Sequence, residues 1–327
     1  MIRNEEERTS QFIDQRVCKL CDIHDFEDPE FGKLAVDIFG DPAISALHHR
    51  KLWEFTITVK ALQRYGLWNR DSRGLSVAAG FERVLYYMTN FTGRIVATDI
   101  YGEGDFIDLE ATGDFLINPE KYRPYEYERE RLSALKMNAL NLHFPKNLFD
   151  FAFCLSSIEH FGGVSNAAVA ISEMGNVVRP GGLVIVTTDC SIDGSSSDQV
   201  FSPAEIKRLV KKSGLELVED IDFYISPDSQ GLLLDMLKDN LDSLPHINLK
   251  FMRSKFTSIC LVFQKKGRED NIKRIDDQEF DRTISKLSSE QYPTKLPIWA
   301  YWGILKVNLF ARYQRGLFRI MKLMGNT

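Results

Sequence analysis

One stretch, residues 74–82, restricts the fold of this chain more than any other. Leu75, Val77 and Ala79 alternate with smaller residues, which is typical of a short buried strand. Gly80 then permits a tight turn, and the residues after it are predicted to begin a helix. A strand that passes through glycine into a helix is the ligand-binding corner of a doubly wound α/β fold. We therefore expect a mostly parallel sheet with helices on both faces.

An acid follows at the distance that this fold predicts. Residues 95–100 form the next predicted strand, and Asp99 stands near its carboxyl end, 19 residues after Gly80. An acid about 20 residues beyond the turn is placed to accept hydrogen bonds from both hydroxyls of a ribose. Asp99 and the neighbouring Ile100 therefore indicate a nucleoside ligand.

The turn itself favours one nucleoside cofactor over another. A dinucleotide-binding turn needs glycine at three places, and these places hold Ala78, Gly80 and Arg83. Glu82 adds a negative charge that repels a pyrophosphate and suits a cationic amino acid tail. Ala78, Ala79, Gly80 and Glu82 are therefore predicted to bind S-adenosylmethionine rather than NAD.

Two more predicted strands bring polar residues to the same edge of the sheet. Residues 132–137 precede Asn138 and Ala139. Asn138 either accepts a hydrogen bond from an adenine amino group or only caps the strand end. Residues 149–154 precede Ser156 and the pair Glu159–His160, which we expect to be exposed in the ligand crevice.

Histidine takes up a proton near neutral pH, so His160, with Glu159 beside it, is the candidate catalytic base. A purely structural role for His160 is the alternative. Two long segments, 101–127 and 189–199, are predicted to act as lids or binding loops near this edge.

Charge and cysteine content narrow the possible partners. The 327 residues carry a net charge of −5, but residues 296–327 hold five Lys or Arg and no acid. The rest carries 36 basic and 46 acidic residues, or −10, so nucleic acid is not an expected partner. Five cysteines indicate reduced thiols in a cytoplasm. Neither a membrane span nor a signal peptide is predicted.

We predict four parts: a helical extension (1–68), a cofactor-binding domain (69–266), a linker (267–296) and a basic amphipathic helix (297–327). In the extension, Cys18 and Cys21 with His24 suggest a metal site, but no fourth ligand is evident and free thiols are favoured. A helix predicted over 46–65 carries a polar and aromatic cluster, residues 48–54. It either closes over the cofactor's amino acid end or presents a solvated face.

The order of these parts resembles the type 11-like class I S-adenosylmethionine-dependent methyltransferases. The motifs that carry the resemblance are Val77-Ala-Ala-Gly-Phe-Glu82, Val96-Ala-Thr-Asp99, Asn147-Leu-Phe-Asp-Phe151, Ser156-Ser-Ile-Glu-His-Phe-Gly162 and Val178-Arg-Pro-Gly-Gly182. Residues 49–54 also look like the start of family members found beside glycosyltransferases in bacterial surface-polysaccharide pathways. The resemblance implies a seven-stranded sheet with an antiparallel last strand, and methyl transfer to a small-molecule or glycan acceptor.

Some residues depart from the family pattern. Ser76 replaces the acid at the end of the first strand, Ala78 replaces the first glycine, and Asn138 stands where an acid is common. Some relatives bind a divalent metal through Glu-x-x-Glu-His. Because Ser156 takes the first position of that motif here, no metal is expected. A cofactor-binding scaffold without catalysis and an NAD-linked oxidoreductase remain the alternative hypotheses.

The C-terminal segment is predicted to lie on a membrane surface. Arg312, Arg315, Arg319 and Lys322 share one side of the predicted helix, with apolar residues opposite and Trp and Tyr near its start. The alternative is that the apolar face packs on the protein's own body or on a second subunit.

Overall fold

The computed structural model describes residues 16–40, 48–104, 110–197, 199–239, 245–267 and 274–290. Its centre is one sheet in the order β4-β3-β2-β5-β6-β10-β9-β8, to which β1 and β7 add at β10. The strands are β1 (Lys19–Leu20), β2 (Arg73–Val77), β3 (Arg94–Asp99), β4 (Leu132–Lys136), β5 (Phe149–Leu155), β6 (Val178–Ser191), β7 (Glu216–Leu217), β8 (Leu233–Asp235), β9 (Asn248–Phe251) and β10 (Ser254–Gln264).

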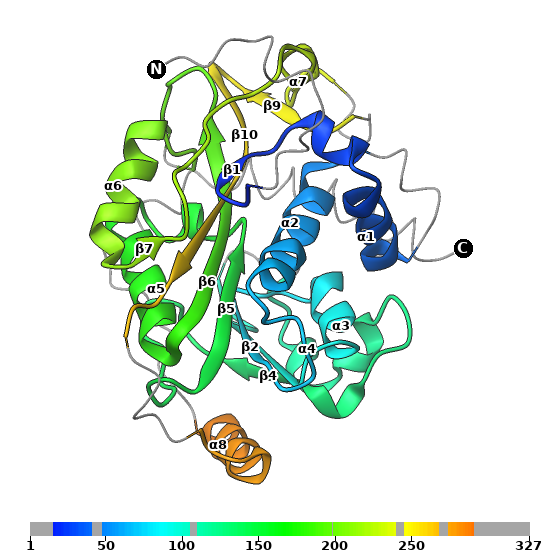
Figure 1. The fold of residues 1–327 in the computed structure, drawn as a ribbon, viewed down its shortest axis with the longest axis vertical. Helices are drawn as coiled ribbons and strands as arrows, with labels where there is room; N and C mark the ends of the chain where they lie inside the picture. The colour runs from blue at the N-terminus through cyan, green and yellow to red at the C-terminus, as the bar shows by residue number, and fades with distance from the viewer. Residues whose placement is uncertain are drawn as a thin grey trace.

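Helices cover both faces of the sheet (Figure 1). The α-helices are α1 (Pro29–Phe39), α2 (Arg50–Arg64), α3 (Arg83–Thr89), α4 (Asp114–Ile117), α5 (Val164–Val177), α6 (Pro203–Ser213), α7 (Pro227–Gly231) and α8 (Asp277–Ser289), and the 3-10 helices are η2 (Ile23–Glu27), η4 (Pro119–Tyr122), η5 (Arg129–Arg131) and η6 (Ile158–His160). Helices α1, α2 and α3 lie on one side, and α5 and α6 on the other.

Alternation along the strands explains why both faces are covered. In β5, Ala152 and Cys154 belong to the core under α5, whereas Phe151 and Phe153 belong to the core under α2 and α3. Successive side chains of a strand point to opposite faces, so a strand that is apolar at every position needs a layer on each side. The doubly wound architecture predicted from the sequence is confirmed.

Strand β10 is antiparallel to β6, as expected for the last strand, but its outer edge is composite. β7 pairs with it at Phe263 and Gln264, β1 at Ile259 and Cys260, and β9 beyond these. Strand β7 is only two residues long. It is short because β1, from the N-terminal extension, takes the next part of the edge.

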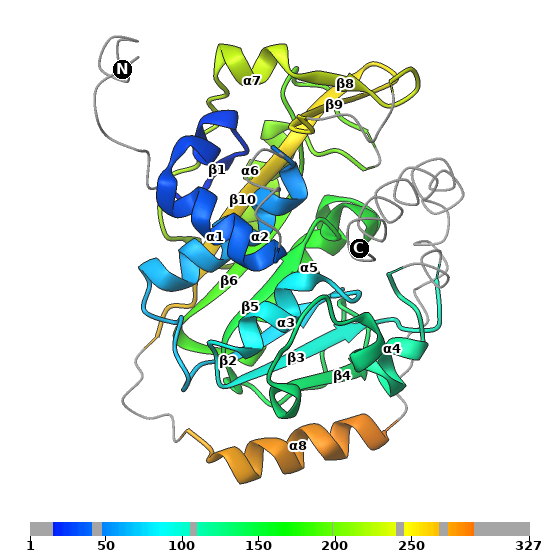
Figure 2. The same ribbon diagram turned by 90° about the vertical axis from the view of Figure 1, so that its right-hand side faces the viewer.

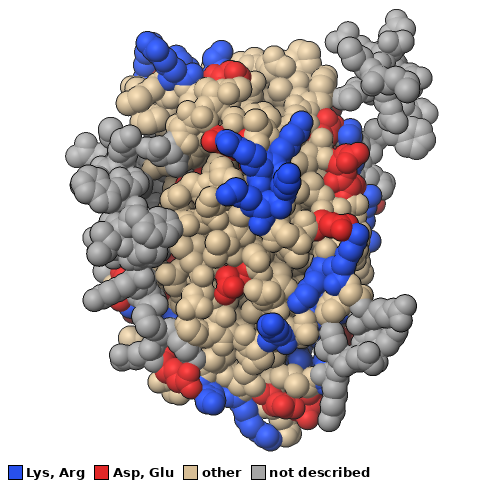
Figure 3. Space-filling model, turned by 90° about the vertical axis from the view of Figure 1, so that its left-hand side faces the viewer, with Lys and Arg blue, Asp and Glu red and all other residues tan. Residues whose placement is uncertain are grey.

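Local sequence signals are accurate for α6. Ser202 accepts a hydrogen bond from the backbone N–H of Glu205, and the Glu205 carboxylate accepts one from the N–H of Ser202. This reciprocal capping box begins the helix, and Gly214 in a left-handed conformation ends it. The face that carries α6 shows one compact group of Lys and Arg side chains (Figure 3).

The segment predicted as a linker contains α8, which runs beside β4 (Figure 2). Ion pairs hold it: Arg73 contacts Asp277 at 2.6 Å and Arg94 contacts Asp281 at 3.0 Å. The Arg73 guanidinium also lies 4.7 Å from the centre of the Phe280 ring. The buried side chains of Phe280, Ile284 and Leu287 dock the helix on the core, and the ion pairs add to that contact.

The five cysteines are free and buried, as the composition indicated. Among the described residues no three His, Cys, Asp or Glu side chains are grouped to hold a metal ion. No helix in the described ranges is long and apolar enough to cross a membrane.

Gly74 is required by packing between two central strands. A Cβ atom at this position would lie 2.4 Å from the Phe151 ring and 2.9 Å from Ile95 Cδ1. We predict that Gly74→Ala lowers the free energy of unfolding by about 1–3 kcal/mol, the usual cost of overpacking a core. Urea titration measures this loss, and Phe151→Leu in the same chain is expected to recover part of it. Gly231→Ala, where a Cβ meets nothing within 4 Å, is the control. An equal loss in both single variants would contradict the packing argument.

Candidate active site

The glycine turn after β2 lies against the carboxyl end of β3. Gly80 N–H donates a hydrogen bond to Asp99 Oδ2 at 2.9 Å, and Ile100 N–H donates to Asp99 Oδ1 at 2.7 Å. Burial raises the pKa of Asp99 to about 6, although both backbone hydrogen bonds oppose the rise. Each carboxylate oxygen keeps a lone pair for a further donor. The structure thus brings Gly80, Asp99 and Ile100 together at one edge.

The backbone is strained where the two central strands reach this edge. Ala78, just after β2, has φ 51°, and Ser156, just after β5, has φ 47°. A left-handed conformation costs a residue with a Cβ about 1–2 kcal/mol. Such strain is concentrated at functional sites, so both positions support a site at the ends of β2 and β5.

The predicted lid segment packs directly on the glycine turn. The Tyr101 hydroxyl donates to the Gly80 carbonyl at 2.5 Å, and a Cβ on Gly80 would lie 2.9 Å from Glu110 Cβ. Glu110 Oε2 is buried without a hydrogen-bond partner among the described residues, and burial raises the pKa of Glu110. This carboxyl group therefore lies over the turn with an unused acceptor.

The N-terminus of α2 lies against the same edge, which agrees with one of the two alternatives stated for the helix predicted over 46–65. Lys51 Nζ lies 2.6 Å from Glu82 Oε1 and 3.2 Å from Glu54 Oε2. The Ser156 hydroxyl donates to Glu54 at 2.6 Å, and the Ser258 hydroxyl of β10 also donates to it. Burial raises the pKa of Glu82 to about 7, although Lys51 opposes this. Glu54 is thus joined to β5 and β10.

A second buried ion pair links α2 to the end of β6. Arg50 contacts Asp189, and the two residues are 4% and 1% exposed. Burial raises the pKa of Asp189 to about 7, despite the attraction of Arg50. Arg50 belongs to the polar and aromatic cluster at 48–54. Its partner was not predictable because 139 residues separate the two.

Glu159 and His160 form η6 directly after β5, but they are not the exposed pair that we expected. Glu159 is 2% exposed, and its Oε2 accepts a hydrogen bond from the Thr188 hydroxyl at 2.7 Å. Burial raises the pKa of Glu159 to about 7 and lowers that of His160 to about 4. The expectation failed because the short connection folds back as η6 against β6 instead of extending into solvent.

Asn138 and Ala139 follow β4 beside the same edge. Met137 N–H donates to the Asp99 carbonyl at 2.8 Å, which ties the ends of β3 and β4 together. The Asn138 side-chain oxygen accepts a hydrogen bond from Leu140 N–H at 2.9 Å. Asn138 therefore makes the local contact of a residue that caps a strand end, in a position next to Asp99.

Acidic groups dominate the edge, and their charge fits a cationic cofactor. Burial raises the pKa values of Glu82, Glu110 and Asp99, so each carboxylate lacks full compensation from its surroundings. S-adenosylmethionine carries a sulfonium and an ammonium group, which would supply that compensation. These carboxylates fit this cofactor, although Glu110 takes the space directly over Gly80.

The fold is that of a Rossmann-like methyltransferase. Residues 75–186 match the family model Methyltransf_11, described as a methyltransferase domain. Residues 75–186 are thus a methyltransferase domain of the kind that uses S-adenosylmethionine. The match runs from β2 into β6, so the α2 residues that close the edge lie outside it. No curated protein matches the chain at a significant level.

Solved structures share the fold at low similarity. A putative methyltransferase from Bacillus halodurans is 17% identical, with 64% of this chain and 98% of that chain covered and a TM-score of 0.41. Phosphoethanolamine N-methyltransferase 2 from Haemonchus contortus, in complex with S-adenosyl-L-methionine, is 15% identical, with 64% and 52% covered and a TM-score of 0.43. A putative sarcosine dimethylglycine methyltransferase from Galdieria sulphuraria is 15% identical, with 52% of this chain and 60% of that chain covered and a TM-score of 0.39. The chain thus spans about half to two thirds of the last two proteins, and these similarities carry no argument about substrate.

Stability is expected to depend on pH through Glu159. Its folded pKa of about 7 exceeds the ordinary value of 4.5, so its stabilising contribution is complete below pH 4.5 and is lost as pH rises through 7. The largest possible effect is about 3 kcal/mol. We predict that Glu159→Gln loses less free energy of unfolding between pH 5 and pH 8 than the wild type, measured by urea titration. Thr188→Val removes the hydrogen bond that lowers this pKa and should lose more. Parallel pH profiles for all three proteins would refute the assignment.

Proposed function

We propose that the protein methylates a small-molecule or glycan acceptor in cell-surface polysaccharide biosynthesis. The observation that carries the methyl-transfer part is Asp99, held at the glycine turn by two backbone donors inside an acidic edge. The polysaccharide part rests on the resemblance of residues 49–54.

The proposed cofactor contacts come from three strand ends. Asp99 accepts hydrogen bonds from the ribose hydroxyls, and Ile100 lies beside it. The backbone of Ala78, Ala79 and Gly80 approaches the cofactor. The remaining assignments are that Asn138 and Ala139 lie at the adenine, Ser156 lies near the amino acid tail, and Glu82 faces the ammonium. Lys51, which contacts Glu82, holds that carboxylate in place.

The acceptor side lies where β5 and β6 end. S-adenosylmethionine supplies an electrophilic methyl group, so the protein mainly has to align the acceptor and, for a hydroxyl, remove its proton. A general base works best when its pKa is close to the operating pH. Glu159, with a pKa of about 7, meets this condition better than His160, with a pKa of about 4. We therefore assign the role of general base to Glu159 and a positioning role to His160.

Cofactor binding tests this proposal. Asp99→Ala removes an acceptor for charge-assisted hydrogen bonds, each worth about 1.5–3 kcal/mol. We expect S-adenosylhomocysteine to bind this variant at least about tenfold more weakly, as measured by titration calorimetry. Asp114→Ala removes an acid of α4 whose side chain is 40% exposed, and this variant should bind as the wild type does. Unchanged affinity in Asp99→Ala would exclude the ribose role.

The predicted membrane helix, 297–327, lies outside the described residues, and we propose that it holds the enzyme at the inner face of the membrane. Its support is the sequence alone: basic side chains on one side and apolar ones on the other. Each Lys or Arg near an anionic surface contributes about 1 kcal/mol, and salt weakens the attraction.

We predict that the full chain co-sediments with vesicles that contain anionic lipid at low salt, whereas a chain ending at Leu296 remains in the supernatant. Neutral vesicles and high salt are the matched controls, because both remove the electrostatic contribution. Equal partitioning of the two chains would contradict a membrane role for this segment.

A further inference from the structure

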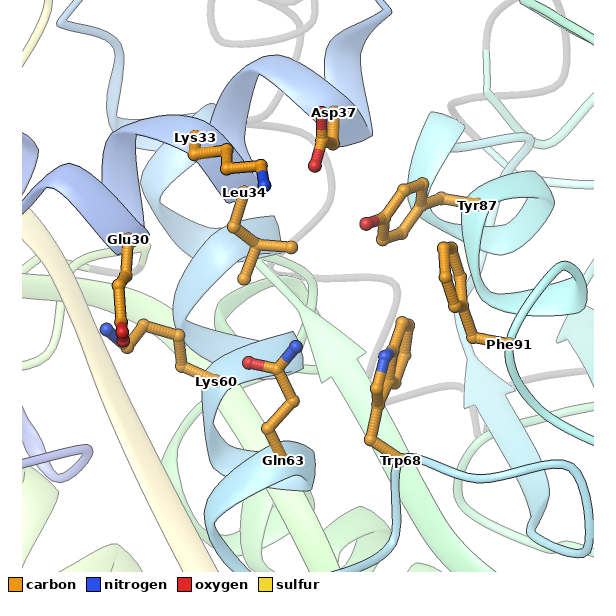
Figure 4. Close-up of a pocket in the computed structure, with 9 residues that line it drawn as sticks. All are labelled: Glu30, Lys33, Leu34, Asp37, Lys60, Gln63, Trp68, Tyr87 and Phe91. Atoms are coloured by element: carbon orange, nitrogen blue, oxygen red, sulfur yellow. The ribbon is translucent and has the colours of Figure 1, made fainter.

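A cavity of about 320 Å³ lies between α1, the C-terminal half of α2 and the end of α3 (Figure 4). Gln63 lines it from α2, twelve residues beyond Lys51 at the candidate active site. At 1.5 Å per residue these positions lie about 18 Å apart along the helix. The cavity is therefore separate from the methyl-transfer site.

One wall of the cavity is aromatic. The Trp68 indole and the Phe91 ring have centroids 5.2 Å apart and an interplanar angle of 24°, and Tyr87 lies 5.9 Å from Trp68 at the same angle. Phe91 is 40% exposed. An aromatic face carries negative charge density and attracts the weakly positive hydrogens of C–H groups. The wall thus offers a flat surface for a ring with C–H groups on its face.

Polar groups face this wall across the cavity (Figure 4). Lys33 and Asp37 come from α1 and Gln63 from α2. Within the part of the chain that the structure describes, none of these three side chains makes a hydrogen bond or ion pair. Lys60, at the cavity's edge, differs, because its ammonium contacts Asp28 at 2.8 Å.

The Tyr87 hydroxyl adds a donor, since burial and the nearby Asp37 raise its pKa to about 12 and keep it protonated. The cavity thus offers donors and acceptors together, which is how small-molecule sites fix the orientation of a ligand.

The balance of charge identifies the class of ligand. Lys60 is paired with Asp28, so the other charged groups of the lining are Lys33, Glu30 and Asp37, and the site has no excess of positive charge for a phosphate. A neutral ligand with one C–H face and several hydroxyls matches the aromatic wall and the polar groups together. The volume lies at the lower end of the range for ligand sites, which suits one or two rings. We propose that this cavity binds a neutral glycosyl unit stacked on Trp68.

The test uses the full chain and four neutral sugars: the methyl glycosides of glucose, galactose and mannose, and N-acetylglucosamine. We expect at least one to show saturation transfer to its ring C–H protons, with a Kd near 1 mM, or about −4 kcal/mol. Trp68→Ala should weaken this binding at least tenfold. Gln63→Ala, which changes only an exposed side chain, should weaken it several-fold and guards against a folding defect in the first variant.

The control is Tyr224→Ala, an exposed aromatic residue (45%) that does not line the cavity, which should bind as the wild type does. Three results would overturn the proposal: no transfer to any sugar at about 50 mM, well above the expected Kd; unchanged sugar binding in both cavity variants; or Trp68-dependent binding of an apolar dye without binding of any sugar.

Discussion

The closed edge of the sheet depends on Glu54, a carboxylate with no exposed surface. It contacts Lys51 within its own helix and accepts hydroxyl hydrogen bonds from Ser156 and Ser258. Removing one partner of a buried charge typically costs about 3–5 kcal/mol, because the remaining group keeps its desolvation penalty. Glu54 therefore fixes α2 against the residue that follows β5 and against β10.

Burying these charged groups costs free energy that apolar side chains at the same positions would not cost. Buried ion pairs are often no more stabilising than well-packed hydrophobic residues. Glu82, Glu159 and Asp189 all have pKa values of about 7 because of burial. A cationic ligand near these groups would favour their charged forms, so its binding would be linked to proton release near neutral pH. The acidic edge is thus better explained by ligand binding than by folding.

The sequence predicted the parts of the site that depend on local pattern. The strand, the glycine turn and Asp99 follow from hydrophobic alternation and spacing, and the α6 boundaries follow from Ser202 and Glu205. Contacts between distant segments were not predictable. Arg50 with Asp189, Glu110 over Gly80, and β1 on β10 each join residues whose separation leaves no periodic signal. Glu159 lies at the end of β5 as expected, but its side chain is buried, whereas we expected it to be exposed. The direction of a short connection depends on tertiary packing, which the sequence pattern does not show.

Hydrogen bonds hold the strained backbone in place at Ala78 and Ser156. A left-handed residue with a Cβ persists only where its surroundings hold it in place. Ser156 meets that condition, since its N–H donates to the Thr187 carbonyl at 2.9 Å and its hydroxyl donates to Glu54. Directly after Ala78, the N–H of Ala79 donates to the Thr98 carbonyl at 3.0 Å. The hydrogen bonds that close the edge therefore also hold both strained turns, so the two central strands end in one fixed geometry.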